Sequence, residues 1–158
     1  RWLRQDVHWL VADGAIFTTS RRDPQTSTPR EVRLPDSLSI VGRFRSGARF
    51  LYDLSGVEAG EGRGEIRVNG SRACLRFDFA TGRLWLTAVT DRQERPMDIP
   101  PERRRGWRVE ADFIDSVRTG TSVRLTTFED GLEYMRIAAA AWQSWQDGAC
   151  RIDLDLVS

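Results

Sequence analysis

The residue types that usually perform proton transfer or nucleophilic catalysis are scarce in this sequence. All 24 Lys-plus-Arg positions are Arg, and no Lys is present. This excludes Schiff-base chemistry, a Lys general base and a P-loop within the chain. His8 is the single histidine, so neither a zinc-hydrolase cluster nor a relay of several histidines can form. The sequence therefore assigns no catalytic, cofactor-binding or metal-ligating residue.

The two cysteines, Cys74 and Cys150, match neither a metal-binding nor a redox C-x-x-C spacing. Buried thiols in a reducing cytoplasm are the simplest interpretation, and a disulfide is the alternative. We therefore expect a cytoplasmic protein.

Positive and negative charges are nearly balanced. Asp and Glu number 23, which leaves a net charge of +1, too small to attract a polyanion strongly. The densest basic run, residues 100–108, has acidic residues close by, whereas a nucleic-acid site needs a broad basic surface. Its simplest interpretation is a solvated loop with Arg ion pairs. No apolar stretch is long enough to span a membrane. We expect neither nucleic acid nor a membrane as partner.

Alternation of apolar and polar residues dominates the chain up to residue 88. Its 158 residues fit one compact domain, and period-two patterning predicts strands. Residues 21–35 are rich in Pro, Ser and Thr and are interpreted as a surface loop, while Asn69-Gly70 predicts a two-residue hairpin turn with positive φ. The predicted strands cover residues 6–18, 37–44, 48–55, 65–68, 73–79, 83–88 and, at the end of the chain, 150–154.

These strands present two different faces. One face is apolar from Leu38 to Leu86 and needs a cover. The other face mixes both signs of charge with a few large apolar groups: Arg43, Arg49, Asp53, Glu65, Arg67, Arg76, Asp78 and Arg83, with Val41, Leu51 and Trp85 between them.

Two helices are predicted to supply the cover. Residues 107–118 stop before Gly120, a suitable left-handed residue, and residues 127–147 start with a Thr127/Asp130 capping box and end at Gly148. The predicted sheet-facing residues of the second helix are Phe128, Leu132, Met135, Ala139 and Trp142, with Ala138, Ala141 and Trp145 widening the stripe. Strands followed by helices predict an α+β fold, an open-faced, mainly antiparallel β-sheet with helices packed on one face.

Residues 113–154 carry a family resemblance. They read FIDSVRTGTSVRLTTFEDGLEYMRIAAAAWQSWQDGACRIDL, with a Phe-led helix ending in Gly-Thr, an acidic-acidic-Gly-Leu helix start, an Ala-rich helix and a final strand. This order resembles the C-terminal end of the Gfo/Idh/MocA oxidoreductases, which include glucose-fructose oxidoreductase and inositol dehydrogenase. Residues 35–37, 45–48 and 65–76 fit the same family's middle strands.

The resemblance implies a two-domain enzyme whose other half is absent here. Family members bind NAD or NADP in an N-terminal Rossmann domain that carries a Glu-Lys-Pro motif, and this chain has neither that domain's glycine-rich motif nor a Lys. The family's catalytic His would precede residue 1, so His8 is interpreted as a strand residue. We expect residues 1–158 to be a single domain on the substrate and oligomerisation side, inactive as a fragment.

The resemblance also points to a substrate contact. In the family, residues just before the first of these helices approach the substrate, which here means Arg105, Trp107 and Arg108. An aromatic face and Arg donors suit a sugar, a polyol or a related hydroxy compound. The mixed-charge sheet face is expected to form a homo-oligomer. The alternative is a non-catalytic binding or assembly module with the same fold.

Overall fold

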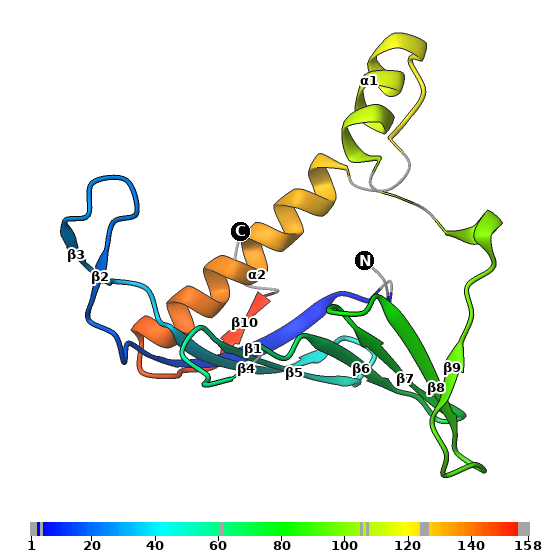
Figure 1. Ribbon diagram of the computed structural model, residues 1–158, viewed down its shortest axis with the longest axis horizontal. Helices are drawn as coiled ribbons and strands as arrows, with labels where there is room; N and C mark the ends of the chain where they lie inside the picture. Colours follow the sequence, from blue (N-terminus) through cyan, green and yellow to red (C-terminus); the bar gives the residue numbers. More distant parts are fainter. Residues whose placement is uncertain are drawn as a thin grey trace. The chain divides into compact units, whose positions relative to one another are not determined.

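The computed structural model describes residues 3, 5–60, 62–104, 106, 108–123 and 127–154. The chain divides into two compact units, one comprising Arg1–Glu58 with Asp112–Ser158 and the other Ala59–Ala111. Figure 1 labels the elements along the chain. Each unit is described by itself.

The first unit is built on a four-stranded antiparallel sheet, hereafter sheet A. Its hydrogen-bonded order is β10-β1-β4-β5, and its residues alternate between two faces. Strand β1 departs from regular pairing at a bulge between Val7 and Trp9. The strands are β1 (Val7–Ala15), β4 (Ser37–Phe44), β5 (Arg49–Ser55) and β10 (Ile152–Asp153).

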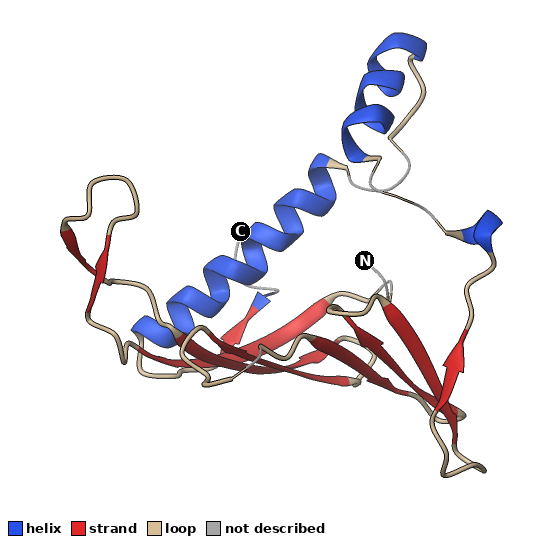
Figure 2. Ribbon diagram, viewed as in Figure 1, coloured by secondary structure: helices blue, strands red, loops and turns tan. Residues whose placement is uncertain are grey.

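Two helices follow the strands in this unit, α1 (Val109–Thr119) and α2 (Phe128–Gln146) (Figure 2). The capping box is confirmed: Asp130 N–H donates to the Thr127 hydroxyl, and Thr127 N–H donates to the Asp130 carboxylate. Gly120 and Gly148 have φ of +70° and +76°, which places left-handed residues where the sequence predicted both helices to end.

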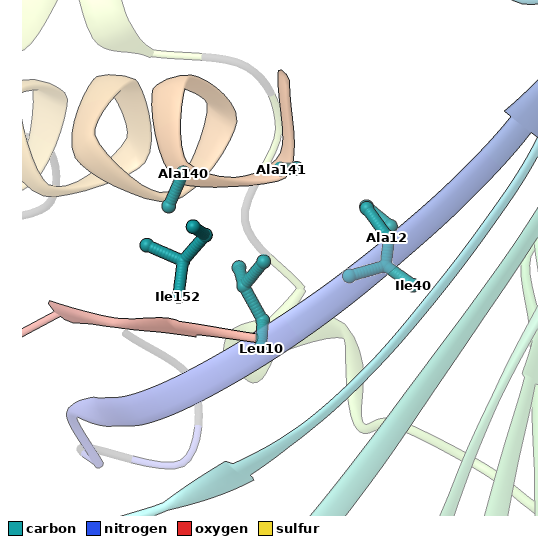
Figure 3. Packing of buried hydrophobic residues seen from close by; sticks show 6 residues of the cluster. All are labelled: Leu10, Ala12, Ile40, Ala140, Ala141 and Ile152. Carbon is teal, nitrogen blue, oxygen red and sulfur yellow. The ribbon is translucent and has the colours of Figure 1, made fainter. Parts of the chain in front are cut away.

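The core of this unit lies where α2 crosses sheet A (Figure 3). Helix α2 contributes its smallest side chains, which let it approach β1 closely. The buried residues are Leu10, Ala12, Ile40, Ala140, Ala141, Ile152 and Ser144.

The prediction of which face of α2 meets the sheet is right for Ala141, which is buried, and for Trp145, whose indole N–H donates to the Gly14 carbonyl at 2.8 Å, but wrong for the other large residues. Phe128, Leu132, Met135 and Trp142 are 84%, 53%, 67% and 45% exposed. The sheet-facing stripe combines two alanines with the polar Ser144, so a search for large apolar residues selects the neighbouring face.

A two-stranded ribbon occupies part of the predicted surface loop. Strands β2 (Ser20–Arg22) and β3 (Pro29–Glu31) pair antiparallel. Asp36 lies beside their base, where its carboxylate accepts the backbone N–H groups of Phe17 and Thr18, both at 2.9 Å. Both hydrogen bonds stabilise the ionised carboxylate and so lower the pKa of Asp36, and the bond from Phe17 lowers it more.

The second unit contains sheet C, with the order β6-β7-β8-β9. Its strands are β6 (Glu65–Asn69), β7 (Ala73–Asp78), β8 (Arg83–Ala88) and β9 (Arg95–Met97), followed by the 3-10 turn η1 (Pro101–Arg103). The predicted Asn69-Gly70 turn is wrong. Gly70 N–H donates to the Ala73 carbonyl, so Ser71 and Arg72 form the turn, and neither Asn69 nor Gly70 has a positive φ.

The α+β fold class is confirmed by antiparallel sheets accompanied by two helices. Among the described residues, no helix is both long and apolar enough to cross a membrane.

Candidate functional site

The predicted substrate contacts precede α1. Arg105 and Trp107 lie outside the described residues, and Arg108 is exposed immediately before the helix. The substrate contact therefore stays a prediction.

The single histidine belongs to β1, as the sequence predicted. His8 is half-buried and occupies the bulge between Val7 and Trp9. Within the described residues, no group of three or more His, Cys, Asp or Glu side chains is placed to hold a metal ion.

The face of sheet A that points away from α2 is the most organised surface of the first unit. We call it the outer face, and it comprises Trp9, Val11, Asp13, Ser39, Val41, Arg43, Arg49, Leu51, Asp53 and Asp153. It lies opposite the core because Leu10, Ala12 and Ile40, which alternate with these residues, pack under α2.

Strand register sorts the outer face into three rows that run across the strands. Val11 lies opposite Val41, which lies opposite Leu51, and this forms an apolar middle row. On one side of it, a row contains Arg43 and Arg49, then Trp9, and then Asp153 of β10, which pairs with Arg151. On the other side, Asp13, Ser39 and Asp53 form an acidic row.

The outer face is exposed at Leu51, and the two arginines beside it bring like charges together. Leu51 is 70% exposed. Arg43 and Arg49 are direct cross-strand neighbours, an arrangement in which like charges repel. No ion pair of Arg43, Arg49 or Asp13 is found among the described residues, while Asp53 accepts a hydrogen bond from Ser39 at 3.0 Å. The Arg151 guanidinium covers the Trp9 ring at 4.7 Å.

The polar face of sheet C, by contrast, neutralises its own charges. Arg76 makes a forked pair with Glu94, with nitrogen-to-oxygen distances of 2.8 and 2.6 Å. This pairing raises the pKa of Arg76 and lowers that of Glu94. The hydrogen bond from Arg67 likewise lowers the pKa of Glu65.

Trp85 is integrated into the same network. The Arg76 guanidinium lies over its ring at 5.1 Å, and its buried indole nitrogen has no hydrogen-bond acceptor among the described residues. The sequence listed Trp85 among the large apolar groups of the mixed-charge face, and in the structure the Arg76 guanidinium covers one side of its ring.

Helix α1 and the first half of α2 expose a further apolar surface. Phe113 and Val117 are 47% and 70% exposed, and the Phe113 ring meets Phe128 edge-on with centroids 6.4 Å apart. The sequence predicted that both helices cover the sheet, so the exposure of these side chains is a finding of the structure alone.

The described residues do not fit a dinucleotide cofactor. A pyrophosphate site needs a parallel strand, a glycine-rich turn and a free helix N-terminus. Every strand pair in the described part of the chain is antiparallel. The N-terminus of α2 is already occupied by the Thr127 capping box and carries Glu129 and Asp130 in its first turn. Those carboxylates would repel a phosphate.

The sequence identified the outer-face residues of β4 and β5 that are charged or large, but not those of β1, and it placed them on one face with residues that belong to sheet C. Arg43, Arg49, Asp53, Val41 and Leu51 were all assigned to one mixed-charge face, which the alternation of sheet A confirms. Their sorting into rows depends on which residues of β1, β4 and β5 lie opposite each other. The signal available from sequence was the turn at Ser46-Gly47: in the structure Phe44 N–H donates to the Ala48 carbonyl, so residues 45–47 connect β4 to β5 and fix their pairing.

Comparison with known proteins identifies the fold. A family model described as "Oxidoreductase family, C-terminal alpha/beta domain" matches residues 6–154. No curated protein matches the chain.

Three solved structures illustrate the similarity. A levoglucosan dehydrogenase in complex with NADH and L-sorbose has a TM-score of 0.77 and 17% identity, over 94% of this chain and 45% of its own. An inositol dehydrogenase homolog from Azotobacter vinelandii, complexed with NADH and myo-inositol, has a TM-score of 0.75 and 19% identity. The similarity covers 96% of this chain and 45% of the homolog. An NAD binding oxidoreductase from Klebsiella pneumoniae has a TM-score of 0.77 and 19% identity, over 94% of this chain and 46% of the Klebsiella protein. The chain thus spans less than half the length of these proteins.

Proposed function

Because the chain belongs to the C-terminal alpha/beta domain family of the Gfo/Idh/MocA oxidoreductases, we propose that it is the substrate-side domain of an NAD(P)-dependent oxidoreductase. The observation that carries this proposal is the family match over residues 6–154. The resemblance noted in residues 113–154 and in the middle strands is thereby confirmed, and the solved structures share the fold over nearly the whole chain.

The proposed substrate is a sugar, a polyol or a related hydroxy compound. L-sorbose and myo-inositol, the compounds bound in two of the similar proteins, are both polyhydroxylated. Arg105 and Arg108 would donate hydrogen bonds to hydroxyl oxygens, and Trp107 would stack on the C–H groups of the substrate.

The proposed division of labour follows from what the chain contains. The nicotinamide cofactor would supply hydride transfer from another part of the protein, because the described residues fit no dinucleotide and the chain has no Lys. This domain would shape the substrate pocket and exclude water from it.

Three further properties belong to the proposal. Residues 1–158 would act as one domain, and the whole protein would form a homo-oligomer through the outer face of the sheet. Because Arg is weakly hydrated and binds carboxylates in a forked geometry, it suits such an interface. Cys74 is half-buried and Cys150 is exposed, so the prediction of buried thiols is wrong for Cys150; both are free thiols, which supports a protein of the reducing cytoplasm.

A turnover assay tests this proposal. The 158-residue chain, and a protein that carries the same chain joined to its nucleotide-binding half, are each mixed with NAD or NADP and a panel of sugars and polyols. Nicotinamide absorbance reports hydride transfer. We expect turnover from the longer protein and none from the chain alone. Turnover by the chain alone would contradict the division of labour. No turnover and no cofactor binding by the longer protein would favour the non-catalytic assembly module instead.

A further inference from the structure

Arg76 and Glu94 join the interior of sheet C to the strand at its edge. We propose that this ion pair fixes the position of β9 and of the segment that leads from β9 to the predicted substrate contacts, so that Arg76 is a positioning residue of the substrate site. This role rests on the proposed function, and it concerns two residues that lie outside the predicted contacts themselves.

Strand β9 has little backbone attachment of its own. It is three residues long and lies at the edge of the order β6-β7-β8-β9, where β8 is its neighbour. Its middle residue, Pro96, has no N–H group, so Arg95 and Met97 are the residues of β9 that can donate to β8. All three residues are exposed. Side-chain contacts are therefore important for the attachment of this strand.

The Glu94 side chain provides such a contact. Glu94 comes immediately before β9, and its carboxylate reaches across β8 to Arg76 on β7. Two nitrogens of Arg76 donate to the two carboxylate oxygens at 2.8 and 2.6 Å, in a forked geometry. The Arg76 side chain is only 19% exposed, so water and salt screen this pair less than a fully exposed one. The pair thus ties the start of the edge strand to an interior strand.

Other contacts hold the Arg76 guanidinium in the orientation that this pair needs. Its remaining terminal nitrogen lies 3.9 Å from the Asp78 carboxylate and 4.0 Å from that of Glu65. The guanidinium also lies over the Trp85 ring at 5.1 Å. Because these contacts already fix the guanidinium, less side-chain entropy is lost when it pairs with Glu94.

The segment after β9 is short and stiff. Two consecutive prolines, Pro100 and Pro101, restrict its backbone rotation. Arg104 closes it, since its backbone N–H donates to the Pro101 carbonyl at 3.1 Å and its Nε donates to the Ile99 carbonyl at 2.7 Å. Residues 98–104 are all exposed, and the predicted substrate contacts begin with the residue that follows them. A change in the position of β9 should therefore be transmitted to those contacts.

Two other ion pairs of sheet C do not tie β9 to the sheet interior. The pair of Arg67 with Glu65 lies within β6, at the opposite edge of the sheet. The pair of Arg95 with Asp91 links β9 to the loop before it. Removal of the Glu94 charge should therefore affect β9, whereas removal of the Glu65 charge should not. These two glutamates provide a test and a control with the same chemical change.

Hydrogen exchange tests whether the pair holds β9. The exchange rates of the Arg95 and Met97 amides are measured by NMR in the 158-residue chain, in Glu94→Gln and in Glu65→Gln. Glu94→Gln keeps the length of the side chain but removes its charge and one acceptor of the fork. We expect exchange in β9 to become at least about threefold faster. Glu65→Gln should leave exchange in β9 unchanged.

Steady-state kinetics tests whether this attachment positions the substrate contacts. The longer protein of the turnover assay is measured with the compound that it turns over fastest, from a panel that includes myo-inositol and L-sorbose. Glu94→Gln should raise the KM for that compound at least about threefold with little change in kcat, which is the pattern of weakened substrate binding. The Kd of NAD or NADP should not change. Partial unfolding would instead lower kcat at an unchanged KM, because fewer molecules would be active. Glu65→Gln should keep the KM of the unmodified protein.

The forked geometry is tested at Arg76. Arg76→Lys keeps the positive charge but cannot form the fork, so it should raise the KM as Glu94→Gln does. The two substitutions remove the same contact. A protein that carries both should therefore have about the KM of the single variants, and not the product of the two increases.

The outcomes separate this role from the proposed function. Faster exchange in β9 together with a raised KM would support the role of Arg76. Unchanged exchange, an unchanged KM, increases that multiply in the double variant, or an equal effect of Glu65→Gln would each overturn it. In all of these cases the unmodified longer protein still turns over its substrate, so the proposed function stands. Absence of turnover by the unmodified longer protein would overturn the proposed function and this role with it.

Discussion

The Ser144 hydroxyl joins α2 to sheet A by bridging backbone groups of Ala12 and Cys150, which do not bond to each other directly. Strands β1 and β10 pair Trp9 with Asp153 and Leu10 with Ile152, so Ala12 and Cys150 would form the next hydrogen-bonded pair. The Ser144 hydroxyl lies between them. It accepts the Ala12 N–H at 2.8 Å and donates to the Cys150 carbonyl at 2.5 Å.

Substitution of this hydroxyl should therefore destabilise the protein measurably. Ser144 and Ala12 are 0% exposed, so Ser144→Ala leaves a buried N–H donor without its acceptor and without access to water. The cost of such a group is about 1–3 kcal/mol. The Cys150 carbonyl adds little because Cys150 is exposed and water can replace the hydroxyl there. At this chain length the loss corresponds to a fall in melting temperature of about 2–4 °C per kcal/mol.

Urea unfolding measures this loss as a lower midpoint with an unchanged m-value. Gln143→Ala, at the exposed neighbouring position of α2, is the control and should change stability by no more than about 0.5 kcal/mol. Faster hydrogen exchange at the Ala12 amide would localise the effect. If Ser144→Ala matched the control in both measurements, the bridging role of the hydroxyl would be refuted.

Three further predictions concern single residues. Because Asp36 has a lowered pKa in the folded chain, its ionised form stabilises the fold above the ordinary Asp pKa of about 4, and this contribution is lost as pH falls through the lower folded-state pKa. The stability difference between the unmodified chain and Asp36→Asn should shrink in acid, and a difference independent of pH would contradict this. Gly42→Ala would place a methyl group 2.5 Å from the Trp9 carbonyl oxygen and 2.4 Å from the Phe50 ring, so urea unfolding should show a loss of about 1–3 kcal/mol. Gly131→Ala meets no atom within 4 Å and should raise stability by about 0.5–1 kcal/mol through helix propensity; a loss there would indicate an unrecognised contact.

Local sequence signals predicted the helix ends correctly. The Thr127/Asp130 capping box and the left-handed Gly120 depend on residues within one turn of each helix, and the structure contains them where the sequence placed them. Asn69-Gly70 shows the limit of such signals, because the pairing of Gly70 with Ala73 shifts the turn to Ser71 and Arg72.

The composition and order of residues by themselves determined which chemistry the chain lacks and which fold class it adopts. The absence of Lys, the alternation of the strands and the motifs of residues 113–154 are all local properties that one sequence displays.

Tertiary structure alone decided which side chains meet. The face of α2 that is buried follows from the close approach of Ala140, Ala141 and Ser144 to β1, which periodicity of large apolar residues misses. Similarly, β1, β4 and β5 come from separate parts of the chain, and only their register places Val11, Val41 and Leu51 in one row between opposite charges. Such contacts depend on long-range pairing, whose energy is shared between residues far apart in sequence and therefore leaves no local pattern.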